Sequence, residues 1–265
     1  MKNFPIRKVG NFEEQKIFTM KNYWLILILA LSFSCKKTID IPQNENITYE
    51  PKSSGEIVKH TYYTLAYSEE NEEAFWVYYQ LTPENINGTQ ARTEDFRPDP
   101  LVSTVSASLA DYAGSGYDRG HLCPAADMKQ NQTAMSETFF LSNMTPQIPG
   151  FNRGIWSTLE AKVRAWALQN SKIYVVTGPV FKSNLGVIGA DQVTVSGFFY
   201  KVIYDGKNKM IGLILPHASS TLSLDHFVVK VDDIEQQTGI DFFPQIEDQL
   251  ENQLEGEINT TNWSF

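Results

Sequence analysis

The chain has 265 residues, of which 42% are hydrophobic and 12% aromatic, so its composition excludes a disordered protein and is ample for one sizeable core. Its two cysteines lie in very different contexts and exclude a disulfide framework. The formal net charge of −9 repels nucleic acid at long range, but six acids and no base are gathered in residues 241–265.

The N-terminal region resembles a bacterial lipoprotein signal. Residues 24–34 are the most hydrophobic stretch, about half of the ~20 residues that span a bilayer. Lys21 precedes them and Cys35 follows, so we expect cleavage before Cys35, acylation of that cysteine and an exported protein anchored in the outer membrane. The alternative is a short buried helix followed by an ordinary cysteine. The expected divisions are an upstream extension, a signal peptide, and a lipidated cysteine with a flexible tether, at residues 1–19, 20–34 and 35–56.

The rest of the chain alternates between strand and helix signals. Two aromatic and β-branched runs joined by a charged turn predict a β-hairpin over residues 60–82. Short β-rich runs bounded by turn-forming residues predict strands at 172–181, 197–205 and 209–216. Helices are expected at 231–239 and at 156–169, the latter with an apolar face of Ile155, Leu159, Val163 and Trp166. This mixture predicts one α+β domain at 57–265, with a central, largely antiparallel sheet flanked by helices and an acidic C-terminal tail.

The segment YDRGHLCPAADM carries a concentrated chemical signal. If it is extended, alternation places Arg119 and His121 on one face, while Gly120 keeps the other face open. A neutral histidine can take a proton from water, and a neighbouring guanidinium can hold phosphate oxygens. Pro124 interrupts the strand pairing and leaves His121 at a strand end.

A second segment, FNRGIWSTLE, places Asn152 at a helix entrance and Glu160 two turns along the helix. Considered alone, Asn152 is typical of a helix cap and Glu160 of a solvated helix face. A functional role for Asn152 and Glu160 is therefore indicated only in combination with the other motifs of the chain.

Four motifs occur in a fixed order, DRGHLCPAAD, TFFLSNMTPQ, FNRGIWSTLE and VVTGPVF, at residues 118–127, 138–147, 151–160 and 175–181. In this order and spacing they resemble the DNA/RNA non-specific endonucleases, a family that includes mitochondrial endonuclease G. The resemblance runs from about His60 to about Pro244. It implies a ββα-metal active site, also called a His-Me finger, within the α+β fold.

The resemblance also implies roles for individual residues. His121 is expected to be the general base, Asn152 the one side chain bound directly to a divalent metal, and Glu160 the carboxylate that holds metal-bound water. Asn143 resembles an asparagine that supports the site, and Arg119 falls at the phosphate-binding arginine of the DRGH motif. A second phosphate-binding arginine is expected at Arg92, with Arg97 as its rival.

The implied reaction is hydrolysis of DNA and/or RNA with Mg²⁺ or Mn²⁺, which leaves 5′-phosphate ends and has little sequence specificity. Two alternatives stay open. One is a surface-anchored binding protein on an inactive nuclease fold, and the other is a phosphodiesterase for smaller phosphate esters. His60, His217 and His226 have no matching partner motif and are interpreted as structural. The sequence has neither HExxH nor paired CxxC, which disfavours zinc, and Cys123 is interpreted as a small buried residue.

Overall fold

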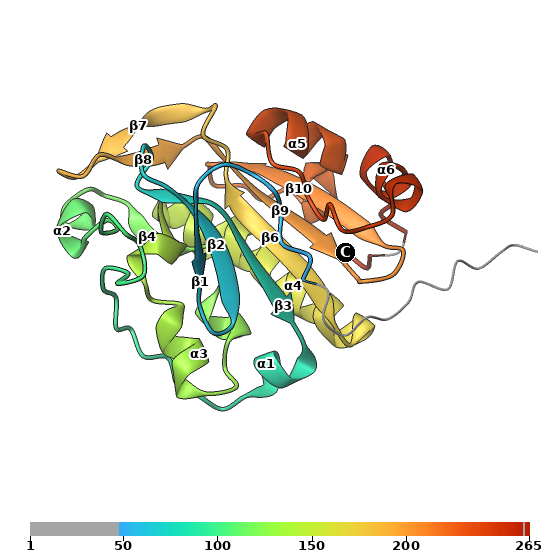
Figure 1. The fold of residues 1–265 in the computed structure, drawn as a ribbon, viewed down its shortest axis with the longest axis horizontal. Coiled ribbons are helices and arrows are strands. Elements are labelled where there is room, and N and C mark those ends of the chain that lie inside the picture. The colour runs from blue at the N-terminus through green and yellow to red at the C-terminus, as the bar shows by residue number, and fades with distance from the viewer. Residues whose placement is uncertain (1–47, 262) are drawn as a thin grey trace, which may run out of the picture. The chain divides into compact units, whose positions relative to one another are not determined.

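The computed structural model describes residues 48–261 and 263–265, and a seven-stranded sheet runs through the middle of this part of the chain (Figure 1). The strand order is β1-β2-β3-β6-β9-β10-β11, and every neighbouring pair is antiparallel. The expected α+β class with a central antiparallel sheet is confirmed. The strands are β1 (Glu56–Lys59), β2 (Tyr63–Ser68), β3 (Glu73–Leu81), β6 (Ile173–Pro179), β9 (Phe198–Tyr204), β10 (Met210–Pro216) and β11 (Val228–Val229).

The strands with strong β-forming runs lie where the sequence predicts them. The hairpin expected at residues 60–82 is β2 and β3, with Tyr63 paired to Tyr79. All of β2 is buried, because aromatic and aliphatic side chains fill both faces of the strand. The other three expected strands are β6, β9 and β10, each within two residues of its expected ends.

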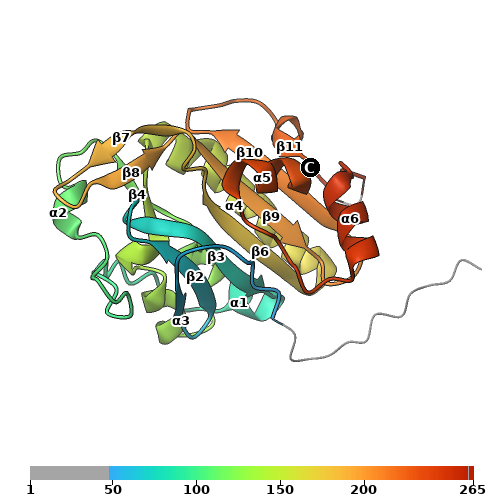
Figure 2. The ribbon, with the colours of Figure 1, turned by 45° about the horizontal axis from the view of Figure 1, so that its top comes forward.

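Helices cover both faces of the sheet (Figures 1 and 2). Alternation along β6 divides the core, since Val175 packs with the side chains of α4 (Ser157–Asn170) and Val176 packs with those of α5 (Val231–Thr238). The apolar face expected for α4 is confirmed, because all four of its predicted residues are buried. The last helix, α6 (Asp248–Gly256), packs beside α5 against β10.

Shorter elements fill the long connections. Two separate antiparallel pairs are formed by β4 (Asp118–His121) with β5 (Met144–Gln147), and by β7 (Asn184–Ile188) with β8 (Val193–Ser196). The short helices are α1 (Pro83–Asn87), α2 (Leu109–Tyr112) and α3 (Gln132–Glu137). The 3₁₀ turns are Ala125–Asp127, Leu141–Asn143 and Leu224–Phe227. A π-helical turn, Phe151–Trp156, leads into α4.

One expectation at the N-terminal end of the domain is wrong. The tether was expected to reach residue 56, but Tyr49 is buried against the core and Lys52 pairs with Asp241 through main-chain hydrogen bonds. The acidic C-terminal tail, which was expected as part of the domain, contains α6, and its Trp263 packs on Trp166. In both segments a few aromatic side chains supply enough apolar surface to hold polar sequence on the core.

The proposed signal peptide, residues 20–34, and Cys35 lie outside the described residues. Within the part of the chain that the structure describes, no helix has the length and apolar character needed to cross a membrane.

Candidate active site

A short antiparallel pair, β4 with β5, presents His121. This residue is the last of β4 and lies opposite Met144 of β5, so it stands at a strand end, as expected from Pro124. The guanidinium carbon of Arg119 lies 4.1 Å from the ring centroid of Phe96, and the His121 ring centroid lies 5.9 Å from the same ring. Arg119 and His121 therefore share one face of the pair, as alternation predicts.

The opposite face of β4 is filled, which corrects the expectation that Gly120 keeps it open. A Cβ atom added to Gly120 would lie 2.2 Å from the Gln147 side chain of β5. Gln147 is fully buried. Glycine is therefore required at position 120 for packing inside the protein, and Gln147 occupies the space that would otherwise be open.

His121 is held in an apolar enclosure. Its ring contacts Phe139 edge-on at 5.1 Å between centroids, and only 9% of the residue is exposed. Its Nε2 has no hydrogen-bond partner among the described residues. Burial lowers the pKa of His121 to about 3, and the positive charges of Arg92 and Arg119 act in the same direction. The ring is therefore neutral at physiological pH, which is the form that can accept a proton.

Asn143 fixes the main chain that follows His121. Its Oδ1 accepts a hydrogen bond from the Cys123 amide at 2.9 Å, and its Nδ2 donates to the carbonyl groups of Cys123 and Thr138 at 3.0 and 2.8 Å. Trp156 adds a bond from Nε1 to the main-chain carbonyl of His121 at 3.3 Å. Asn143 is fully buried, so it positions the strand end and does not face solvent.

Asn152 lies in the π-helical turn before α4 and does not cap a helix. Its Nδ2 donates to Oδ2 of Asp118 at 2.8 Å, and no helix amide donates to its side chain within the described residues. The helix-cap interpretation is therefore wrong. Because its amide group is used as a donor, the carbonyl oxygen of Asn152 is left for another partner.

Asp118 ties β4 to the entrance of α4. Arg153 donates to both of its carboxylate oxygens, at 2.8 and 2.6 Å, while Asn152 donates to Oδ2. Burial alone would raise the pKa of Asp118, but the bonds from Arg153 and Asn152 outweigh it and lower that pKa. The sequence analysis did not assign a role to Asp118, although it is the acid of the DRGH motif.

Glu160 faces a group of buried charges, so the interpretation of a solvated helix residue is wrong. Burial raises the pKa of Glu160 to about 7, and Asp127 raises it further, while the cations Lys201, Arg164 and Arg92 act in the opposite direction. Arg92 therefore acts on the pKa of both Glu160 and His121. The charge of Arg92 therefore connects the two predicted site residues electrostatically.

Lys201 is a residue that sequence reasoning missed. It is fully buried on β9, where its Nζ donates to Oγ1 of Thr177 at 3.1 Å and to the Leu122 carbonyl at 3.4 Å. The same nitrogen lies 4.5 Å from the ring centroid of Trp156. Burial lowers the pKa of Lys201, and Glu160 is the strongest influence that opposes this effect. In the sequence, the presence of a single lysine inside the apolar run GFFYKVIYD could have indicated a buried charge at this position.

Asp127 completes the charged group beneath the site. It is fully buried, accepts a hydrogen bond from Tyr79 at 3.0 Å and pairs with Arg164 at 2.9 Å. Burial raises its pKa, although Arg164 and Lys201 oppose that rise. Buried Asp127 and partly buried Glu160 are thus influenced by the same two cations of the chain, Arg164 and Lys201.

The two candidate arginines differ in their partners. Arg97 donates to the side chain and main-chain carbonyl of Asp95 and to the main chain and hydroxyl of Ser136, and it stacks on Phe140 at 4.0 Å. Arg92 is half-exposed, pairs only with exposed Glu94 among the described residues, and lies 4.7 Å over the Phe139 ring that also contacts His121. The guanidinium of Arg97 is therefore used in contacts within the fold, whereas Arg92 contacts the same Phe139 ring as His121.

The remaining histidines and Cys123 have other surroundings. His60 pairs with buried Asp99 at 2.8 Å, and His217 bridges the Ser196 carbonyl and the Ile148 amide. His226 is exposed on a 3₁₀ turn. Cys123 is fully buried, and burial raises the pKa of its thiol, so a reactive thiolate is disfavoured.

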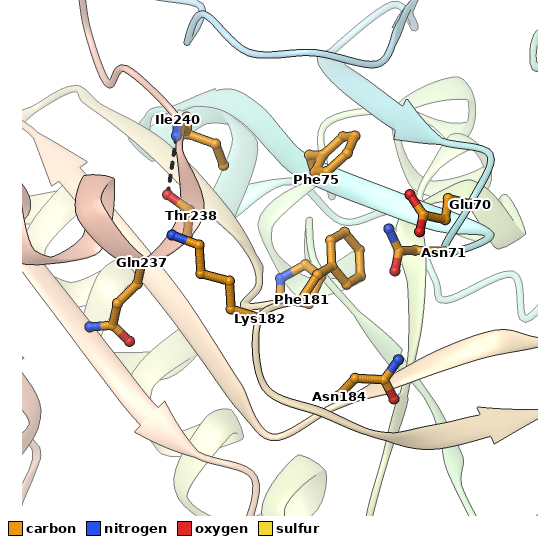
Figure 3. A pocket seen from close by; sticks show the side chains of 10 residues that line it. Glu70, Asn71, Phe75, Phe181, Lys182, Asn184, Gln237, Thr238 and Ile240 are labelled. Atoms are coloured by element: carbon orange, nitrogen blue, oxygen red, sulfur yellow. Dashed lines mark hydrogen bonds between the residues drawn. The ribbon is translucent and has the colours of Figure 1, made fainter.

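A surface pocket elsewhere lacks such chemistry. It is lined by residues that include Phe75, Phe181, Lys182 and Gln237 (Figure 3). None of the predicted site residues lines it, and it contains no histidine or cysteine. The arrangement around His121 thus differs in kind, since it combines a neutral base, nearby arginines, an amide oxygen and a carboxylate.

Comparisons with known proteins identify relatives. Residues 42–249 match the model of the DNA/RNA non-specific endonuclease family. Mitochondrial endonuclease G of Bos taurus is 37% identical over 202 residues, which cover 69% of this chain and 68% of that protein. Nuclease C1 of Cunninghamella echinulata var. echinulata is 36% identical over 228 residues, which cover 78% and 90%. A solved complex of EndoG with EndoGI superimposes with a TM-score of 0.69 and 33% identity, and covers 75% of this chain and 89% of that one.

Proposed function

The chain belongs to the DNA/RNA non-specific endonuclease family, and from this premise we propose that it is a metal-dependent hydrolase that cuts phosphodiester bonds of DNA and/or RNA with little sequence specificity. The observation that carries the proposal is the state of His121. It is an uncharged imidazole beside two arginines, its buried Nε2 has no hydrogen-bond partner within residues 48–261 and 263–265, and its enclosure keeps it neutral.

In this proposal His121 is the general base. A neutral imidazole accepts the proton of the attacking water at a ring nitrogen, and the edges of Phe96 and Phe139 hold the ring in place. The same cations that lower the pKa of His121, Arg92 and Arg119, become ligands for the non-bridging phosphate oxygens and offset their growing charge. Because these contacts reach the phosphate and not a base edge, sequence specificity is low.

The chain offers a fitting set of donors for a divalent cation such as Mg²⁺ or Mn²⁺. Asn152 can offer its side-chain carbonyl oxygen as a metal ligand, because its Nδ2 donates a hydrogen bond to Asp118 and so fixes the orientation of the amide. Glu160 supplies a carboxylate, and hard cations prefer oxygen ligands and keep several waters. When bound, such an ion polarises the phosphate and stabilises the leaving 3′ oxygen, which gives 5′-phosphate ends.

Asn143 acts as a positioning residue in this proposal. Its three hydrogen bonds fix the main chain after His121, so the base keeps its orientation when the polymer binds. Asp118 has the corresponding role for Asn152, because it orients the side-chain amide from β4.

The test is a substrate panel with the full chain in detergent. Plasmid DNA, RNA and a nitrophenyl phosphodiester are incubated with Mg²⁺ and, separately, with a chelator. Mg²⁺-dependent cleavage of either polymer is the expected result. Cleavage of the small ester alone would support a phosphodiesterase, and binding of polymer without cleavage would support an inactive binding protein.

We also propose that the protein is exported and anchored to the outer membrane through acylated Cys35. The support is the hydrophobic stretch of residues 24–34, with Lys21 before it and Cys35 directly after it. Mass spectrometry of the mature N-terminus tests this. A diacylated or triacylated Cys35 is expected, and an unmodified N-terminus upstream of it would contradict the anchor.

A further inference from the structure

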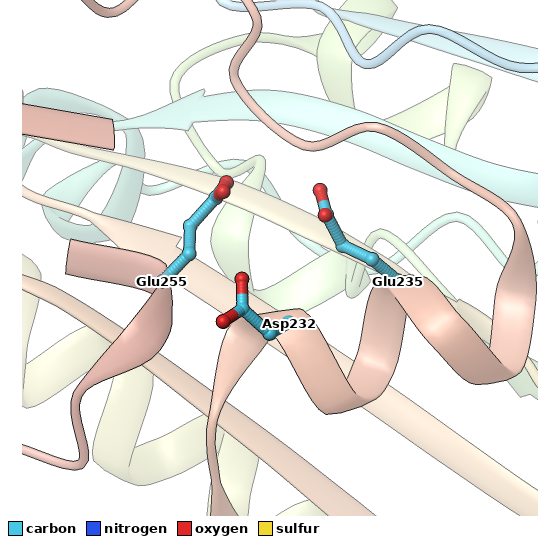
Figure 4. Close-up of side chains that lie close together, drawn as sticks. All are labelled: Asp232, Glu235 and Glu255. Carbon is cyan, nitrogen blue, oxygen red and sulfur yellow. The ribbon is translucent and has the colours of Figure 1, made fainter. Parts of the chain in front are cut away.

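Three carboxylates converge between the last two helices, on the other face of the sheet from α4. Asp232 and Glu235 belong to α5, and Glu255 belongs to α6. One oxygen of each lies within 4.8 Å of one oxygen of each of the others. Figure 4 shows the three side chains gathered at the space between the helices.

Glu255 is the unusual member of this group. It is 6% exposed, it is the buried residue of α6, and its Oε1 has no hydrogen-bond partner among the described residues. The apolar residues of α6, Leu250 and Leu254, are only partly buried. A helix whose most buried side chain is an unpartnered acid needs either a proton or a cation on that acid, because burying a lone carboxylate is costly.

No cation of the chain supplies that charge. Among residues 48–261 and 263–265, no ion pair includes Asp232, Glu235 or Glu255. Further acids, Glu251 and Asp241, increase the negative charge. Burial, followed by Glu235, Glu251, Asp232 and Asp241, raises the pKa of Glu255 to about 9. Without an external cation Glu255 therefore keeps its proton at neutral pH, and a divalent cation bound among the three carboxylates would take the place of that proton.

We propose that Asp232, Glu235 and Glu255 bind a structural Ca²⁺ ion that fastens α6 to α5. Calcium takes six to eight oxygen ligands at about 2.3–2.6 Å, so three oxygens within 4.8 Å of one another can share one ion, with water and Glu251 available for the remaining positions. The cluster shares no residue with the group around His121 and Asn152. Its ion supports folding of the C-terminal segment and takes no part in hydrolysis.

The experiment measures Ca²⁺ binding by calorimetry and thermal unfolding on the full chain in detergent, after treatment with a chelator. All proteins carry Asn152→Ala, which weakens the other candidate metal site. We expect Ca²⁺ at about 100-fold above its Kd to raise Tm by about 5 °C. Glu255→Gln should lose this shift, and without Ca²⁺ it should unfold at the same Tm as its parent or higher, because a neutral amide of the same shape replaces a carboxyl that is protonated in the absence of the ion.

A matched control is Asp233→Asn, which removes an exposed acid of α5 outside the cluster and should keep the full shift. If Glu255→Gln does not fold, Asp232→Asn replaces an exposed ligand and should weaken Ca²⁺ binding about tenfold, which is ~1.4 kcal/mol. The proposal is overturned if Ca²⁺ leaves the Tm of the parent unchanged, or if the cluster variants bind Ca²⁺ as the parent does.

Discussion

Two clusters of acidic side chains in the described part of the molecule balance their charge in opposite ways. Beneath the candidate active site, Asp127 and Glu160 are faced by Arg164 and Lys201 of the same chain. Between α5 and α6, the acids around Glu255 form no ion pair within the described residues. The first cluster is neutralised by folding alone, whereas the second needs a proton or a cation from solution.

This difference explains how an acidic protein can act on a polyanion. The net charge of −9 includes acids that are concentrated near the C-terminus, on elements that cover the other face of the sheet. Near His121, Asp118 is paired with Arg153, and Arg92 and Arg119 lie over the Phe139 and Phe96 rings that contact His121. Local charge, and not net charge, therefore decides whether the polymer can approach.

The largest expected effect is on catalysis and comes from His121→Ala. Removal of the base should slow plasmid cleavage by about 10²–10⁴-fold, while the main-chain bond from Trp156 to residue 121 remains and preserves the fold. Cleavage rates and Tm are measured together. His226→Ala, which removes an exposed histidine, is the control and should cleave normally. Near-normal turnover of the His121 variant would show that another residue is the base.

The next prediction concerns a variant that leaves the acids beneath the candidate active site with one cation fewer, so that they resemble the acids between α5 and α6. Lys201→Met removes a buried cation from Glu160 and Asp127, and should lower the free energy of unfolding by about 3 kcal/mol. Urea unfolding measures this loss. The control, Lys207→Met, removes an exposed cation and should change stability by less than about 0.5 kcal/mol. A loss for Lys201→Met as small as that of the control would mean that Lys201 does not compensate the buried acids.

The third prediction separates the two arginines. Arg92→Ala should lower kcat/KM for plasmid DNA by about 10- to 100-fold with little change in Tm, because its ion pair with Glu94 is exposed. Arg97→Ala should instead reduce stability by about 1–2 kcal/mol, since it loses bonds to Asp95 and Ser136, and should retain kcat/KM. The reverse pattern would assign phosphate binding to Arg97.

The smallest effect concerns stability at acidic pH. The pKa of His121 is about 3 in the folded chain and near 6.5 when unfolded, so between these values the unfolded state binds the extra proton. Stability of the wild type therefore falls as pH falls below about 6.5. His121→Asn should remove this contribution, which is about 1 kcal/mol per pH unit, as measured by urea unfolding from pH 6.5 to 4.5. Parallel stability curves for the two proteins would contradict a buried, neutral His121.

Sequence patterns predicted the parts of the fold that depend on local signals. The long β-rich runs and the apolar face of α4 follow from periodicity, and their elements occur as expected. The four-residue strand β5 is too short to give a periodic signal, and α6 was missed because it offers only two apolar side chains, Leu250 and Leu254, in an acidic segment. Tyr49 and Trp263 were assigned to a tether and a tail because single aromatic anchors in polar sequence give no periodic signal.

The candidate site was predictable as a set of residue identities and not as a set of contacts. Motif order selected His121, Arg119, Asn143, Asn152 and Glu160, and the choice of those residues stays a prediction. The partners of these residues depend on tertiary structure. Asp118 binds Asn152 across the chain, and Lys201 reaches the site from β9, so neither contact could be inferred from spacing.

The proposed role of Asn152 as ligand of a divalent metal is tested by the Mg²⁺ dependence of plasmid cleavage by Asn152→Ala. We expect this variant to need much more Mg²⁺ or to cleave far more slowly, with Tm almost unchanged because Asp118 keeps its bonds to Arg153. A normal Mg²⁺ response together with a large fall in Tm would show that Asn152 has a structural role and does not bind the metal.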